Sequence, residues 1–150
     1  MLKDALKNAG ILLPLLVLSA GTWTDLREKS VDVRPILLAG LAGIMIRVIM
    51  RDESVPELLA ALAPGMILLA LTIASRGGVG AGDGLSLLAL GLYFPPEEVW
   101  AILFTALCFG GVTGALLLIR GRGRGDSFPF LPCLLAGFLC CEIARMILRR

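Results

Sequence analysis

The sequence has 150 residues, of which 57% are hydrophobic, and its mean hydropathy of +0.89 is too high for a soluble domain, whose surface must face water. Its formal net charge of +2, without a run of Lys and Arg interleaved with aromatic residues, argues against a nucleic acid as partner. Histidine is absent and the four cysteines form no C-x-x-C pair, so we expect no metal site and no cofactor, and acid–base chemistry falls to carboxylates.

Six apolar stretches predict an all-α, polytopic membrane protein of about six transmembrane helices, with residues 1–150 forming one integral membrane domain. They lie at about residues 9–24, 35–50, 58–75, 84–94, 99–119 and 128–148. The third and fifth reach the ~17–20 residues that a spanning helix needs. The second spans only if Arg47 reaches the interface, and the sixth only if Glu142 and Arg145 lie near its outer end. We expect these last two residues to pair, because they lie three apart on one helix.

The first and fourth stretches are the least regular. Lys3 and Lys7 precede the first stretch, which is followed by small residues, so a secretory leader is an alternative to a first spanning helix. We favour the spanning helix because the rest of the chain is membrane-embedded. The fourth stretch spans only if its helix begins within the glycine-rich turn at 80–83, which would place Asp83 at the helix N-terminus.

The connecting segments are short, and we expect loops at 25–34, 51–57, 76–82, 95–98 and 120–127. Lys and Arg are divided equally between the two sides of the membrane, so their number does not set the orientation. The densest basic cluster is the RGRGRGDS segment at 120–127, which favours a cytoplasmic location for that side and contact with anionic membrane lipid.

Two aspartates carry the chemistry that the sequence suggests. Asp25 follows the first stretch and Asp83 follows the third, so two crossings separate them and they face the same side of the membrane. A carboxylate at membrane depth costs about 2.5–3.5 kcal/mol at a helix centre and less near the interface, which makes it a functional candidate. Two carboxylates that meet can share one proton, the arrangement that aspartyl catalysis uses. Gly80 and Gly82 would let a substrate strand approach Asp83 closely.

Each carboxylate also has a structural interpretation. Asp83 can cap the fourth helix in a helix-breaking turn, and Asp25 can be a helix-end or loop charge. Asp32, seven residues after Asp25, is a rival partner if the first helix continues that far.

Three segments in order distinguish these interpretations: Thr24-Asp25-Leu26-Arg27, Gly80-Ala81-Gly82-Asp83 and Phe128-Pro129-Phe130-Leu131-Pro132. In this order they resemble type IV prepilin peptidases, which are membrane aspartyl proteases of the GxGD type, and the similarity covers nearly the whole chain. The resemblance implies that Asp25 and Asp83 are the catalytic pair. It also implies site-shaping or substrate-binding roles for Gly80, Gly82, Pro129, Phe130 and Pro132.

The same resemblance implies an aspartic endopeptidase of the inner membrane whose active site faces the cytoplasm. Its partners would be prepilin or pseudopilin precursors of a type IV pilus or secretion system, cut between a short basic leader and an apolar helix. Three departures bear on substrate docking: Val31-Asp32-Val33 replaces I-P-N, Leu85 replaces a lysine, and Leu131 replaces a glycine. The chain lacks the cysteine-rich insertion of larger members, so we expect the minimal, peptidase-only form.

Two other functions stay open at this point. The chain can be a non-catalytic membrane subunit or a small transporter in which Asp25 and Asp83 bind a proton or another cation. It can also be a family member that has lost activity and acts as a chaperone for pilins.

Overall fold

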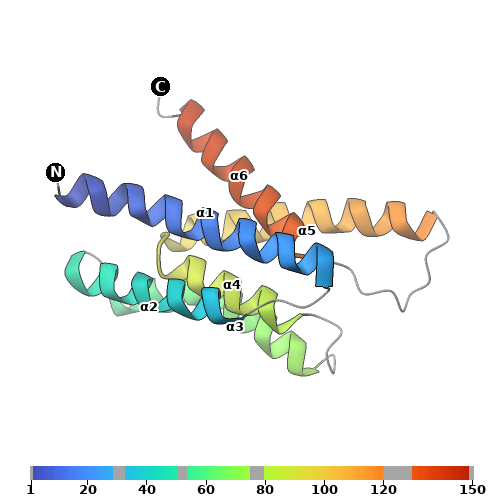
Figure 1. Ribbon diagram of the computed structural model, residues 1–150, viewed down its shortest axis with the longest axis horizontal. Helices are drawn as coiled ribbons and strands as arrows, with labels where there is room; N and C mark the ends of the chain where they lie inside the picture. Colours follow the sequence, from blue (N-terminus) through green and yellow to red (C-terminus); the bar gives the residue numbers. More distant parts are fainter. Residues whose placement is uncertain (1, 29–32, 51–53, 75–79, 120–129, 149–150) are drawn as a thin grey trace.

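The computed structural model describes residues 2–28, 33–50, 54–74, 80–119 and 130–148; for 2–9, 24–28, 50 and 118 it describes the helix alone. Every regular element in these ranges is an α-helix, which confirms the all-α class. Successive helices alternate in direction along the long axis, and α6 leans away from the others toward its C-terminus (Figure 1). The helices are α1 (Leu2–Glu28), α2 (Val33–Met50), α3 (Val55–Ala74), α4 (Ala81–Gly91), α5 (Pro96–Ile119) and α6 (Leu131–Leu148).

Three of these helices, α3, α5 and α6, are long and apolar enough to cross a membrane. The apolar part of α1, Gly10–Trp23, and all of α4 are shorter, so six crossings remain a prediction. Large apolar side chains lie on the outside of the bundle, for example Leu38, Ile73 and Phe104, which are 67%, 80% and 60% exposed. Lipid would cover such side chains in a membrane protein.

The expected loop at 25–34 is wrong over most of its length, because α1 continues to Glu28 and α2 begins at Val33. Residues 22–33 contain no Gly or Pro, so nothing in the backbone stops the helix where the apolar residues end. Pro35 lies in the first turn of α2, where a missing N–H removes no helical hydrogen bond. The last turn of α1 therefore carries Asp25 on a helix and not in a loop.

Helix α4 is the central helix of the bundle, since most of its 11 residues are buried. It lies against α3 with almost no side chain between the two backbones. A Cβ added to Gly65 would lie 2.6 Å from the Leu88 backbone N, and one added to Gly91 would lie 2.5 Å from the Ala61 carbonyl O. Small residues permit such close packing where lipid gives no hydrophobic drive for association.

A hydrophobic core fixes α4 on its other sides. Phe94, just after α4, packs edge to face on Phe138 of α6, with the ring centroids 5.6 Å apart. Such aromatic pairs add roughly 0.5–1.5 kcal/mol beyond their burial. The core comprises Leu18, Leu68, Leu87, Leu90, Phe94, Val99, Ile102, Leu103, Ala106, Leu134 and Phe138.

Arg47 of α2 binds the C-terminal end of α4. Its guanidinium donates to the carbonyl oxygens of Leu92 (Nε, 2.9 Å) and Gly91 (Nη2, 2.8 Å), which have no partner within a helix that ends there. Nearby, the Tyr93 hydroxyl donates to the Ala39 carbonyl of α2 at 2.5 Å. Helix α2 thus holds the turn between α4 and α5. Arg47 therefore has partners within the protein, in addition to any contact with the membrane–water interface.

An ionic cluster joins α5 and α6 at the end of the bundle where α4 ends. Arg145 pairs with Glu142 at 3.2 Å, as predicted, and also with Glu98 of α5 at 2.8 Å. All three side chains are part-exposed, so this cluster contributes little to stability, although it connects the C-terminal half of α6 to α5.

Candidate functional site

Asp83 is the centre of the candidate site. It lies in the first turn of α4, as the sequence predicted, and only 6% of it is exposed. Its backbone N–H donates to the Gly80 carbonyl at 3.1 Å, which begins the helix. The helix N-terminus favours a negative charge at this position, since the first-turn N–H groups point toward it.

Gly80 lies directly beneath the Asp83 carboxylate. A Cβ placed on Gly80 would lie 2.9 Å from Asp83 Oδ2 and 3.5 Å from its carboxyl carbon. The backbone at Gly80 is extended, with φ −67° and ψ 129°, so any residue could adopt it. Glycine at position 80 therefore matters for the room that it leaves to the carboxylate. Gly82, the second glycine of the motif, is buried in the same turn.

The end of α1 that carries Asp25 and the start of α4 lie toward the same end of the molecule, on the right in Figure 1. Contacts also join α1 directly to α4 and to α6. The side chain of Asp25 lies outside the described part of the structure, as does Asp32. The fold therefore places positions 25 and 83 toward the same end of the bundle.

The start of α6 reaches the same end of the bundle. A Cβ on Gly21 of α1 would lie 2.6 Å from Leu131 Cδ2, so α1 meets the first turn of α6 near Asp25. Phe130 packs on the core, and its carbonyl accepts the Leu134 N–H at 3.0 Å. Pro132 occupies the first turn of α6, and Pro129 lies outside the described residues.

The other described acids are poorer candidates. Glu97 and Glu98 are in the first turn of α5, and Glu142 is near the end of α6. All three lie at the end of the bundle away from Asp83. Within the described ranges, no three or more His, Cys, Asp or Glu side chains are grouped as a metal ion would require. Asp83 is the one buried acid in this part of the chain.

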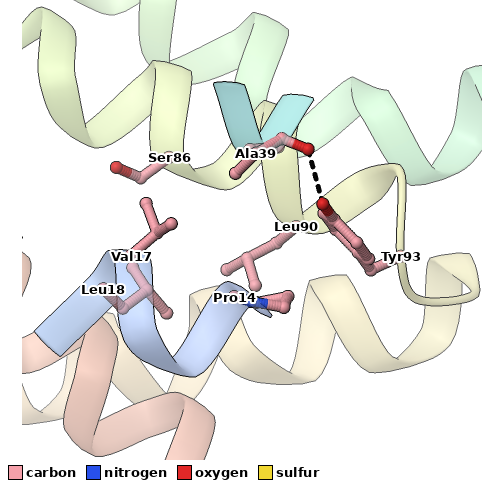
Figure 2. A pocket seen from close by; sticks show the side chains of 8 residues that line it. Pro14, Val17, Leu18, Ala39, Ser86, Leu90 and Tyr93 are labelled. Carbon is pink, nitrogen blue, oxygen red and sulfur yellow. Dashed lines mark hydrogen bonds between the residues drawn. The ribbon is translucent and has the colours of Figure 1, made fainter. Parts of the chain in front are cut away.

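A small cavity lies further along α4, between α1, α2 and α4 (Figure 2). Its volume is about 10 Å³, which is roughly the space that one water needs. Its walls are almost entirely apolar, with the hydroxyls of Ser86 and Tyr93 as side-chain polar groups among its lining residues. The cavity is too small to be a peptide-binding site.

Chemically, the site is a buried carboxylate at the N-terminus of α4. The helix that carries Asp25 ends at the same end of the bundle.

A comparison with protein-family models matches residues 11–119 to the type IV leader peptidase family. No curated protein and no solved structure matched the chain. The matched segment covers most of the sequence and contains both Asp25 and Asp83. The chain therefore belongs to the type IV leader peptidase family.

Proposed function

We propose that this protein is an aspartic endopeptidase that removes the short basic leader from type IV prepilin or pseudopilin precursors, with Asp25 and Asp83 as the catalytic pair. The observation that carries the proposal is the burial of Asp83 at the end of the bundle where α1 ends, in a chain of the type IV leader peptidase family. Cleavage would take place at the cytoplasmic boundary of the inner membrane.

In the proposed reaction, one aspartate is ionised and the other protonated, because like-charged carboxylates at one site do not both ionise readily. The ionised carboxylate takes a proton from water while the water oxygen bonds to the peptide carbonyl carbon. The protonated carboxyl gives its proton to the carbonyl oxygen. Transfer of a proton to the amide nitrogen then breaks the C–N bond and releases the leader and the new N-terminus.

We propose that substrate recognition uses the same end of the bundle. The basic leader would bind near the carboxylates, and the apolar stem would lie along the lipid-facing helices. Gly80, Gly82, Phe130 and Pro132 lie in the turns that start α4 and α6 and would shape the path of the substrate strand. Leu85 stands where related peptidases often carry a lysine, and residues 31–33 replace their I-P-N. Both departures would affect this docking step.

The direct test is cleavage of a synthetic precursor by the purified protein in lipid or detergent, read by mass spectrometry. We expect a single cut at the junction of basic leader and apolar stem. A matched precursor with glutamate in place of the leader lysines should be cut more slowly, since it loses attraction to the carboxylates. An intact precursor together with a pH- or ion-dependent flux through liposomes would instead favour the proton- or cation-binding transporter.

Gly80→Ala should lower kcat by about tenfold to a hundredfold with little loss of stability. The added methyl would lie 2.9 Å from Asp83 Oδ2, so the carboxylate must move, whereas the extended backbone accepts alanine. Steady-state cleavage and thermal unfolding measure the two effects.

Gly111→Ala is the matched control, because a Cβ at this position of α5 meets no atom within 4 Å. We expect it to leave kcat unchanged. Equal activity of the Gly80 and Gly111 variants would show that the position of the Asp83 carboxylate does not depend on residue 80.

A further inference from the structure

Two polar residues are buried in the described part of the chain, and they are one helical turn apart. Asp83 is 6% exposed and Ser86 is 3% exposed, and both lie on α4. Residues three apart lie on the same face of a helix. The other residues of α4 are apolar or glycine, so the Ser86 hydroxyl and the Asp83 carboxylate are its two polar side-chain groups.

The Ser86 hydroxyl has no hydrogen-bond partner among the described residues, and neither does Thr22 Oγ1 of α1. Other helical hydroxyls of this protein satisfy themselves by donating to a carbonyl three or four residues back, the common solution in an apolar helix. They are Ser19 to Leu16 at 2.9 Å, Thr72 to Leu68 at 3.0 Å, Thr105 to Ala101 at 2.7 Å, and Thr113 to Phe109. Ser86 and Thr22 therefore differ from the general pattern.

Each of these two unpartnered hydroxyls is three residues in sequence from a member of the proposed catalytic pair. Ser86 comes three residues after Asp83, and Thr22 comes three residues before Asp25. Helical side chains tilt toward the N-terminus, so the Ser86 hydroxyl lies over the turn that contains Asp83. Figure 2 shows its oxygen directed away from Leu90 and Tyr93, toward the start of α4.

Leaving a buried hydroxyl unpaired lowers stability, so its presence calls for a partner that other states of the protein supply. We propose that Ser86 is a positioning residue, whose hydroxyl donates to the Asp83 carboxylate, directly or through one water, during catalysis. The inference rests on the proposed peptidase function. A hydroxyl donor orients the carboxylate and favours its charged form, which would make Asp83 the member of the pair that activates water.

The test is Ser86→Ala in the cleavage assay. We expect kcat to fall by about tenfold to a hundredfold, with KM within roughly twofold of wild type, as for loss of a hydrogen bond to a charged group. The melting temperature should stay the same or rise, because the variant removes an unpaired buried hydroxyl. Ser86→Thr keeps a hydroxyl and should recover most of the kcat.

Ser19→Ala is the matched control, since Ser19 is exposed and its hydroxyl already donates to Leu16. It should leave kcat unchanged. A wild-type kcat in Ser86→Ala, measured beside an active wild type, would overturn this inference alone. A fall in kcat matched by a fall in melting temperature would also overturn it, because a structural role would then suffice. An inactive wild type would overturn the proposed function as well.

Thr22→Val tests whether the two hydroxyls serve the same pair. The variant removes the hydroxyl and keeps the shape of the side chain. If both hydroxyls support one dyad, the double variant should lose less than the product of the two single losses. A product of independent effects would exclude Thr22 from the arrangement and leave the Ser86 result to stand by itself.

Discussion

Replacing Asp83 by Asn is expected to reduce leader cleavage by about a thousandfold or more, and Asp25→Asn is expected to do the same. An amide has nearly the shape of a carboxyl group, but it neither accepts a proton from water nor donates an acidic proton to the carbonyl oxygen, and general acid–base steps contribute about 10²–10⁴-fold each. The double variant should be no worse than either single one, because the two groups act as a unit.

The measurement is single-turnover cleavage of a precursor by each variant in detergent or lipid, with product identified by mass spectrometry. Asp83→Asn should still fold, since Asn has nearly the shape of the buried Asp that it replaces, and thermal unfolding checks this. Asp32→Asn is the control, because Asp32 is the rival partner in the sequence. Full activity of either catalytic-pair variant would remove that residue from the dyad, and loss of activity in Asp32→Asn would make Asp32 the partner.

Arg47→Met is expected to lower the free energy of unfolding by about 2–4 kcal/mol. The variant keeps an apolar stem but leaves the Gly91 and Leu92 carbonyls without the guanidinium, and hydrogen bonds to a charged group contribute ~1.5–3 kcal/mol each. It also removes a cation from the C-terminal end of α4, where the helix dipole favours one. Denaturant or thermal unfolding in detergent micelles measures the loss.

Arg47→Lys should recover part of this stability, because a lysine supplies the charge without the two-armed geometry that reaches both carbonyls. Wild-type stability of Arg47→Met would show that the Arg47 contacts do not hold α4 in place. Because α4 carries Asp83, we also expect Arg47→Met to lower cleavage.

The helices themselves were predictable because their signals are local. Helices α3, α5 and α6 each correspond to one continuous apolar stretch of sequence, and the glycine-rich turn at 80–83 indicates the start of α4. The pairing of Glu142 with Arg145 was predictable for the same reason, since it depends on a spacing of three along one helix. The order of the aspartate, GxGD and proline-rich segments pointed to the family to which the chain belongs.

The error at residues 25–34 has the opposite cause. Charged residues suggested a loop, but charge does not end a helix, and without Gly or Pro α1 continues past Asp25 to Glu28. The role of Arg47 was also beyond the sequence, because its acceptors are more than 40 residues away. Ser86 offered one signal, its position three residues after Asp83, but its lack of a partner cannot be read from spacing.

By itself, the sequence determined the all-α class, the approximate helices, the candidate aspartates and the family resemblance, since apolar length and motif order are properties of the chain. Only the tertiary structure decided that α4 is the central helix, that Asp83 and Ser86 are both buried, and that Arg47 closes the end of α4. Burial and hydrogen-bond satisfaction depend on side chains that are distant in sequence, and packing alone brings them together.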